Sequence, residues 1–463
     1  MAGRSSAVDD TATVVRRAPY ASTPLVGARG QRAQVRIVEA ALQVFGEVGY
    51  HACGIQRITE VSGCSRASFY QYFSSKEDVF RHLAGQVAKR LADATAAIDA
   101  IGPDGAGRDA LFGWLDSHST IYDDFEPVFM AFQIAAANDE ALVSGAGRVA
   151  GRTSAMIRDK IHGSPLPERE IDDVVRTLLD TVTRANRVSE LLELSAVPSA
   201  GLARSRLNRT LADVFHRALF GIDPDVNVRT PSRRRRIRLV AGDLDLSTDP
   251  DPSSTLGPAA RRTRALLLDR AHDVFAEKGF HATRVADIVG AAGVSHGVFY
   301  RYFDNKADIF ELLARQAAQH MSTAVDVLPV LILGSAAGSP STDSESTTST
   351  VIAPRVLRRW LRTYADTYSS GAAIIAMWVE ALSRDQLLGP LSVAAVEHSR
   401  AMFAEKLEVR HFGDVDAEAI VLLVLMDSMT SQAVTRSRLE RYARLIERAL
   451  LVRLPEAGRR ARR

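Results

Sequence analysis

The fold is decided by residues 279–306, with the sequence GFHATRVADIVGAAGVSHGVFYRYFDNK, and by a near copy at residues 49–76, GYHACGIQRITEVSGCSRASFYQYFSSK. Both stretches lie within a longer repeat, because residues 41–88 align without a gap on residues 271–318 and are identical at 21 of 48 positions. Self-similarity of this kind indicates that one structural unit occurs more than once. The sequence therefore predicts a tandem duplication with two diverged halves.

Each copy shows the order of elements found in a helix-turn-helix. Apolar residues three and four apart predict helices, and a glycine at the end of the first helix can adopt the closing left-handed conformation. A second glycine, Gly63 or Gly293, predicts the tight turn, and the serine two residues later can cap the next helix. The predicted helices span residues 35–47, 55–62 and 66–72 in the first copy and residues 264–277, 284–292 and 296–302 in the second.

The third helix of each copy has an apolar face and a polar face. Phe69 and Phe73, four residues apart, are predicted to face the core, as are Phe299 and Phe303. Tyrosines on the other face suit DNA, since the ring packs on the sugar-phosphate backbone and the hydroxyl donates a hydrogen bond. In the first copy the residues predicted to face outward are Arg66, Ala67, Ser68, Tyr70, Gln71 and Tyr72. At the start of a fourth helix, Ser74-Ser75-Lys76 and Asp304-Asn305-Lys306 predict an anion site.

The pattern Gly-Val-Ser-x-Gly-x-Phe-Tyr-x-Tyr-Phe-x-x-Lys, which ends at Lys306, resembles the DNA-binding domain of TetR-type transcriptional regulators. The resemblance implies a three-helix DNA-binding domain on a larger helical effector domain, usually in a homodimeric repressor released by a small ligand. It implies phosphate contacts for Tyr70, Tyr72, Lys76, Tyr300, Tyr302 and Lys306. It implies contacts at or near base edges for Arg66, Ala67, Ser68, Gln71, His296, Gly297, Val298 and Arg301. The hydroxyl of Thr283 is expected to cap the second helix or to touch phosphate.

The two copies differ at the positions that would face bases. Arg66 and Gln71 of the first copy suit guanine and adenine edges, whereas Val298 of the second copy can make only apolar contacts. We therefore expect the copies to read unlike half-sites. We also expect the two halves to pack as an internal pseudo-dimer through their last helices, so that a monomer is favoured over a homodimer. The chain as a whole resembles the tandem TetR regulators of actinobacteria, including the repressor type associated with mammalian-cell-entry operons.

Composition supports an all-α protein with two such units. The chain is 46% hydrophobic and 24% charged, with 52 Arg, 6 Lys and only 2 Cys, and its apolar runs are too short for a membrane helix. A cytoplasmic protein that binds double-stranded DNA and no membrane is expected. The predicted domains are an N-terminal arm (1–29), a first helix-turn-helix domain (30–80), a first effector-like domain (81–221), a basic, Pro-rich linker (222–258), a second helix-turn-helix domain (259–310), a second effector-like domain (311–455, with a disordered insert at 334–350) and a basic tail (456–463).

Aromatic residues four apart form one stripe in each effector-like domain. Such stripes belong more often to a packed core, but they can also line a pocket for a small hydrophobic effector, with lipids among the candidates. The candidate ligand residues are Trp114, His118, Tyr122 and Phe129 in the first half and Trp360, Tyr364, Tyr368 and Trp378 in the second.

Other chemistry has little support in the sequence. The acidic residues around His118 are more simply a solvated turn than a metal site, and no phosphate-binding loop or catalytic motif is present. We expect neither an enzyme nor a protein with a metal or cofactor. Arg29, Arg32 and residues 233–238 could enter a minor groove or remain solvated. Two other functions stay open at this point, a non-specific architectural DNA binder and a ligand-binding protein with an idle helix-turn-helix.

Overall fold

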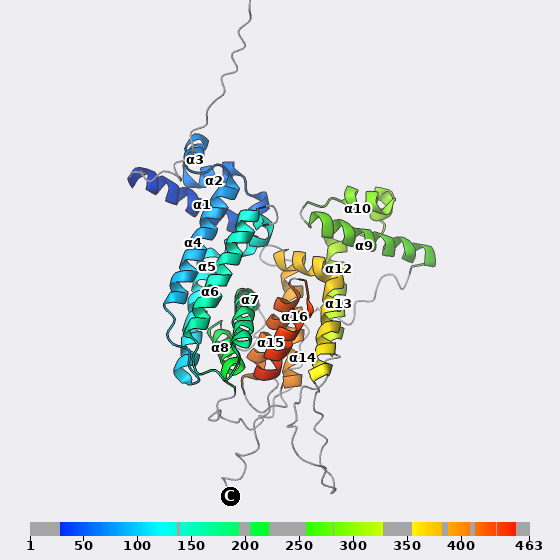
Figure 1. Cartoon of the computed structure of the whole chain (residues 1–463). Coiled ribbons are helices and arrows are strands. Elements are labelled where there is room, and N and C mark those ends of the chain that lie inside the picture. Colours follow the sequence, from blue (N-terminus) through cyan, green and yellow to red (C-terminus); the bar gives the residue numbers. More distant parts are fainter. Residues whose placement is uncertain are drawn as a thin grey trace, which may run out of the picture. The chain divides into compact units, whose positions relative to one another are not determined.

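The computed structural model describes residues 28–136, 139–193, 204–221, 256–280, 282–326, 354–381, 388–407, 413–431 and 433–450. Within these residues every extended regular element is an α-helix, which confirms the predicted all-α fold class (Figure 1). None of these helices is long and apolar enough to cross a lipid bilayer. The predicted arm, linker, insert and tail lie outside the described residues, apart from a few residues at the edges of the arm and the linker.

The described helices repeat in the same order in both halves. The first half contains α1 (Ala28–Ala52), α2 (Ile55–Ser62), α3 (Arg66–Tyr72), α4 (Lys76–Ala96), α5 (Gly105–Ala136), α6 (Glu140–Lys160), α7 (Glu168–Glu193) and α8 (Arg204–Phe220). The second half contains α9 (Pro258–Lys278), α10 (Val285–Ala292), α11 (His296–Phe299), α12 (Lys306–Asp326), α13 (Pro354–Ala381), α14 (Leu388–Leu407), α15 (Val415–Thr430) and α16 (Arg436–Ala449).

These helices form two compact units. The first contains the residues up to 93 and residues 120–151, and the second contains residues 94–119 and the residues from 152 onward. The first unit holds α1 to α3 with parts of α4, α5 and α6. The second unit holds the remaining parts of those helices, α7, α8 and the whole second half. The division does not follow the repeat, because α7 and α8 of the first half pack against α15 and α16 of the second half.

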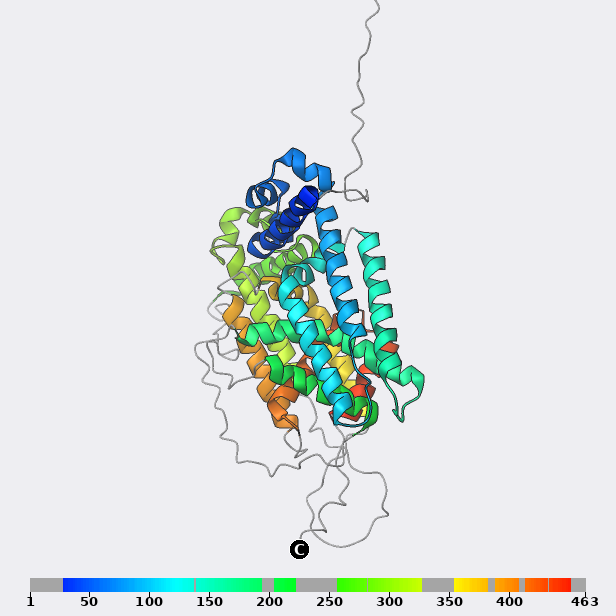
Figure 2. The same ribbon diagram turned by 90° about the vertical axis from the view of Figure 1, so that its left-hand side faces the viewer.

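Four helices at the centre of the second unit form a bundle that joins the two halves. In Figures 1 and 2, α7 and α8 lie against α15 and α16. Side chains from all four helices belong to one hydrophobic core. Leu178 and Phe215 come from the first half, and Leu425 and Tyr442 from the second; each is at most 2% exposed. This bundle is the internal pseudo-dimer predicted from the repeat.

Both helix-turn-helix domains have the predicted local structure. The turn glycines Gly63 and Gly293 have φ of 65° and 64°, a left-handed conformation that suits glycine. Phe69, Phe73, Phe299 and Phe303 are buried as the spacing predicts. The first helix begins earlier than predicted in both copies, and α11 ends at Phe299 and is followed by turns, whereas a helix to residue 302 was expected.

Candidate nucleic-acid interface

The helix α3 presents an exposed polar face in the first domain. Arg66, Ala67 and Gln71 are exposed, Ser68 is half-buried, and Tyr70 is 38% exposed. The Tyr70 ring meets the buried Phe69 ring edge to face, with 5.6 Å between the centroids. Packing of this kind fixes the position of the ring while the residue as a whole stays exposed.

The second domain presents the corresponding face on α11 and the turns after it. His296, Gly297 and Arg301 are exposed, Val298 is half-buried, and Tyr300 is 55% exposed. Tyr300 packs edge to face on Phe299 with a centroid distance of 5.4 Å, which repeats the arrangement of the first domain. The two domains therefore hold their exposed tyrosines in the same way and differ in the side chains around them.

Two tyrosines lie deeper than predicted. Tyr72 is only 8% exposed, so the expectation that it faces outward is wrong. Tyr302 is half-buried and packs against the core of the second domain. The physical reason is visible in the spacing, because residue 72 lies three positions after Phe69 and so shares its buried face.

The lysines at equivalent positions of the two domains bind the protein's own backbone. Lys76 Nζ donates to the carbonyl oxygens of Tyr50 and Cys53 at 2.9 and 3.2 Å, and Lys306 Nζ donates to those of Phe280 and Thr283 at 2.8 and 2.9 Å. Each ammonium also lies over an aromatic ring, 4.7 Å from the Tyr50 centroid and 4.6 Å from the Phe280 centroid. Burial lowers the pKa of Lys306. Both lysines thus hold the connection between the first and second helices of their domain, a role that the phosphate assignment did not foresee.

The start of the fourth helix is also capped from within. Asp78 accepts hydrogen bonds from the backbone and hydroxyl of Ser74, and Asp308 accepts one from the backbone of Asp304. Asn305 Oδ1 accepts from two further amides, those of residues 307 and 308. A carboxylate therefore already occupies the place where the sequence predicted an anion site, and that prediction needs correction.

Thr283 has a structural role as well. Its side chain is 1% exposed, and its hydroxyl donates to the carbonyl oxygen of Gly279 at 2.7 Å. The N-cap of α10 is Arg284, whose backbone amide donates to Asp287 Oδ2 at 2.8 Å. Thr283 therefore neither caps α10 nor faces the surface, and its assignment to DNA contact is corrected.

The two recognition helices differ in how they begin. Ser65 Oγ accepts from the backbone amide of Ser68 at 3.1 Å, which is the predicted N-cap bond of α3. Ser295 precedes α11 at the corresponding position without such a side-chain bond. Gly297 also favours helix less than Ala67 does. These differences account for the shorter α11.

The aromatic stripes of the effector-like domains lie inside the protein. Trp114, His118, Tyr122, Trp360 and Tyr364 are each at most 5% exposed. Tyr368 and Phe129 are half-buried, and the Trp378 side chain lies outside the described residues. The stripes thus contribute to the packed core, which was the alternative left open by the sequence, and their use as ligand sites stays a prediction.

Polar residues that the sequence did not single out surround the first stripe. Asn186 Oδ1 accepts from Ser119 Oγ at 2.6 Å, and the Asn186 amide nitrogen lies 3.1 Å from His118 Nδ1. Asn208 donates to Ser119 Oγ at 2.9 Å, and all four residues are at most 4% exposed. The network joins α5 to α7 and α8 of the bundle. No sequence motif marks it, because its members lie up to 90 positions apart.

The fold and the exposed faces define a protein with two helix-turn-helix domains. Residues 37–83 and residues 267–313 each match the family model described as bacterial regulatory proteins, tetR family. The chain therefore carries two TetR-type helix-turn-helix domains in tandem.

Curated relatives with this similarity are transcriptional regulators by name. The HTH-type transcriptional repressor KstR2 of Rhodococcus jostii is 43% identical over 68 residues, 15% of this chain and 32% of the relative. The HTH-type transcriptional repressor AcnR of Corynebacterium diphtheriae is 38% identical over 60 residues, 13% of this chain and 32% of the relative. The Fatty acid metabolism regulator protein of Bacillus subtilis is 42% identical over 50 residues, 11% of this chain and 26% of the relative. The chain thus spans about a third or less of the length of these relatives.

Proposed function

We propose that the protein is a sequence-specific transcriptional regulator, acting as a repressor, in which a single chain reads two unlike half-sites of a DNA operator. The observation that carries the proposal is the pair of TetR-type domains with the same buried framework and different exposed side chains. Relatives named as repressors support the DNA-binding role. The tandem arrangement also supports the resemblance of the sequence to the repressor type that is associated with mammalian-cell-entry operons.

The exposed side chains support different base preferences in the two domains. Arg66 and Gln71 of the first domain can form paired hydrogen bonds with guanine and adenine edges, respectively. In the second domain Arg301 can bind guanine, while Val298 can contact a thymine methyl group. Identical half-sites would leave one of the two faces mismatched, so an operator with unlike halves fits the chain better than a palindrome.

The bundle supports the use of one chain for both half-sites. Helices α7 and α8 of the first half share a core with α15 and α16 of the second, as the two subunits of a dimer would. A covalent link removes the concentration dependence that an ordinary dimer has. A monomer is thus the expected DNA-binding species.

Footprinting on genomic fragments, combined with native mass spectrometry of the complex, tests this proposal. We expect one chain per asymmetric site. Arg66→Ala should relax base choice in one half-site and Arg301→Ala in the other, each by about 10-fold against the wrong base. Tyr70→Phe and Tyr300→Phe serve as matched controls that should weaken binding without changing the preferred sequence. Two chains on a symmetric palindrome would contradict the proposal.

We further propose that a small hydrophobic effector, with lipids among the candidates, releases the DNA. The support is that both aromatic stripes are hydrogen-bonded to bundle helices: His118 lies against Asn186, and the Tyr368 hydroxyl lies 3.4 Å from Asp427 Oδ1. A ligand beside either stripe could therefore shift the bundle. Fluorescence anisotropy of labelled operator with added fatty acids tests this, and undiminished DNA binding at saturating lipid would count against it.

A further inference from the structure

One buried ion pair links the two halves inside the bundle. Arg217 of α8 is 8% exposed and pairs with Glu418 of α15, which is 1% exposed. Arg217 Nε also donates to the carbonyl oxygen of Ala449 at 3.0 Å. A buried ion pair contributes little to stability compared with an apolar pair, but removing one partner leaves a charge buried without compensation. Such a pair therefore affects the specificity of association more than the stability of the folded chain.

The duplication shows that each half carries only one member of this pair. Helices α8 and α16 both begin with Arg-Ser-Arg-Leu, which places Ala449 at the position of Arg217. Helices α7 and α15 begin at residues 168 and 415, and Asp180 and Asp427 lie equally far from these starts. This alignment places Ile171 at the position of Glu418. Two first halves would thus bury two arginines opposite isoleucine. Two second halves would bury two glutamates opposite alanine.

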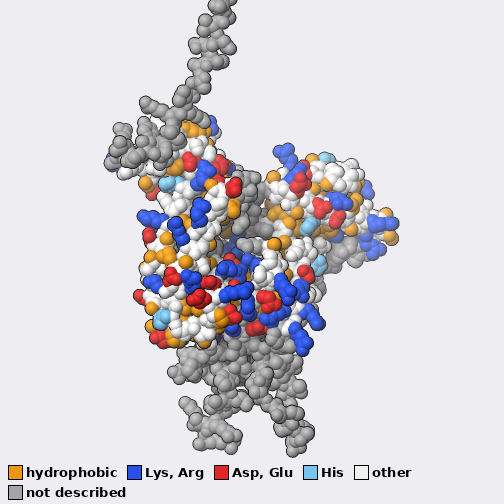
Figure 3. Space-filling model, viewed as in Figure 1, with side chains coloured by type: hydrophobic (Ala, Val, Ile, Leu, Met, Phe, Trp, Pro, Cys, Tyr) orange, Lys and Arg blue, Asp and Glu red, His pale blue; other side chains and the backbone are white. Residues whose placement is uncertain are grey.

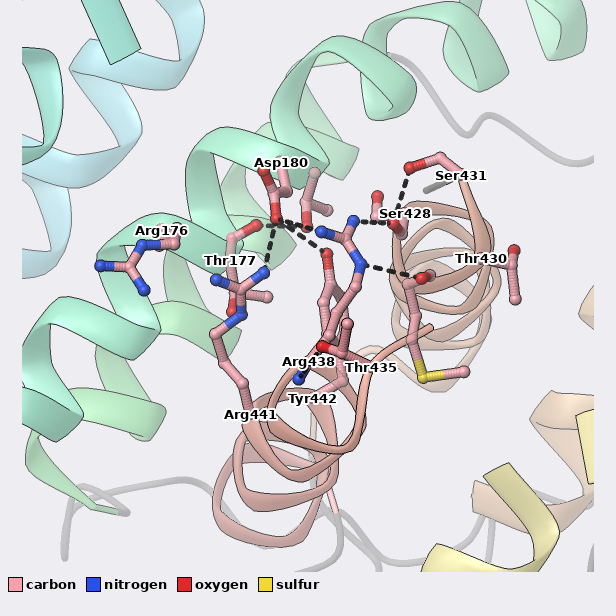
Figure 4. Close-up of polar contacts among 12 residues, drawn as sticks. Arg176, Thr177, Asp180, Ser428, Thr430, Ser431, Thr435, Arg438, Arg441 and Tyr442 are labelled. Carbon is pink, nitrogen blue, oxygen red and sulfur yellow. Dashed lines mark hydrogen bonds and ion pairs between the residues drawn. The ribbon is translucent and has the colours of Figure 1, made fainter. Parts of the chain in front are cut away.

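A second cluster differs between the halves only at Tyr442, because Arg438 and Arg441 correspond to Arg206 and Arg209 of the first half, and Asp180 corresponds to Asp427 of the second. Asp180 of α7 accepts from Arg441 at 2.8 Å and lies 3.4 Å from Arg438 and 3.5 Å from the Tyr442 hydroxyl, all on α16 (Figure 4). The counterpart of Tyr442 in the first half is Thr210, whose hydroxyl is too short to take this position.

Further ion pairs at the edge of the same contact are also lost in a pairing of like halves. Asp173 accepts from Arg444 at 3.2 Å, and Glu170 pairs with Arg448. The counterparts of these arginines in the first half are Ala212 and His216. Acidic and basic side chains accordingly lie close together over α7 and α16 (Figure 3).

The pairing between α8 and α15 is one-sided at the surface too. Arg206 binds Asp414 through two hydrogen bonds of 2.5 and 2.7 Å, and the residue at the position of Asp414 in the first half is Pro167. A pair of first halves would therefore lose this contact as well. The buried pair and the surface pairs all favour the same partner.

We propose that the bundle face of each half recognises only the other half of the chain, and that Arg217 and Glu418 are the residues that exclude pairing between like halves. This inference concerns assembly and does not depend on DNA binding. It predicts that the halves stay together, as one first half and one second half, even when the covalent link is removed.

The experiment starts from the full chain with a protease site placed within residues 222–255. After cleavage, native mass spectrometry should find the two fragments as a 1:1 complex at nanomolar concentration. Arg217→Glu should raise the fragment dissociation constant at least ~100-fold, and Glu418→Arg should do the same. The double swap, Arg217→Glu with Glu418→Arg, should recover the affinity to within ~10-fold. Arg152→Glu on the exposed part of α6 is the matched control and should have no effect.

An apolar replacement separates specificity from stability. Arg217→Met with Glu418→Leu should keep the cleaved chain folded and associated, while pairs of like fragments appear after exchange between differently labelled samples. The unmodified cleaved chain should exchange without forming such pairs. Like pairs in the unmodified chain, or a double swap no tighter than the single swaps, would overturn the proposal.

Discussion

The two helix-turn-helix domains keep the same interior and differ at the surface. Both have a lysine on two backbone carbonyls, a left-handed glycine in the turn and an exposed tyrosine packed on a buried phenylalanine. They differ in the side chains at the positions proposed to read bases and in the capping and length of α3 and α11. The difference teaches that, after duplication, contacts that hold a domain together were retained while its exposed residues diverged.

The effector-like domains differ at one buried position, unlike the interiors of the helix-turn-helix domains. His118 of the first half corresponds to Tyr364 of the second, and both are buried. Burial lowers the pKa of His118 to about 4, whereas it raises the pKa of Tyr364. Only the first half should therefore respond to mild acid at this position.

The largest expected effect is the loss of this response in His118→Asn. The unfolded chain binds a proton at His118 near the ordinary pKa of 6.5, but the folded chain does so only near 4. The stability linked to this group is fully present above pH 6.5 and falls by up to about 3 kcal/mol as the pH drops to 4. Chemical denaturation between pH 4 and 7 measures it.

Comparing the variant with the original chain separates the contribution of His118 to the acid response from that of the other histidines. Burial also lowers the pKa values of His82 and His216, so the original chain and the variant should both lose stability in acid, the variant by less. His162→Gln, at an exposed position, should keep the original slope. Equal slopes in the His118 variant and the original chain would show that burial does not lower the pKa of this imidazole.

A smaller effect is expected from Lys306→Met, which tests the structural role of the lysine against a phosphate contact. Losing the two bonds to backbone carbonyls should lower the free energy of unfolding by about 2 kcal/mol. Lys76→Met should behave alike because its contacts are equivalent. Lys89→Met, on the exposed side of α4, is the control. Unchanged stability together with a salt dependence of DNA binding reduced by about one charge would instead support a phosphate contact.

The smallest effect concerns the two N-caps. Ser65→Ala removes the bond to the Ser68 amide and should destabilise α3 by about 1 kcal/mol. Ser295→Ala should cost less, since Ser295 makes no such bond. Hydrogen exchange at residues 66–73 and 296–303 measures each helix separately. A larger loss in the second domain would mean that α11 is capped by its serine in solution.

Much of the fold could be predicted from the sequence because its signals are local. Helix spacing, turn glycines and the repeat identified α2, α3 and the duplication, and the repeat also predicted the pairing of the last helices. The burial of Tyr72 could have been predicted from its spacing to Phe69. The partners of Lys76 and Lys306 could not, because those carbonyls lie 23 and 26 positions earlier in the chain.

Because α3 and α11 display different side chains, no rotation can make the two helix-turn-helix domains equivalent. A symmetric dimer binds a palindromic DNA site equally well in either orientation. Under the proposed function, this chain would instead bind an asymmetric operator in one orientation, so the direction of the operator would decide which neighbouring gene each domain faces.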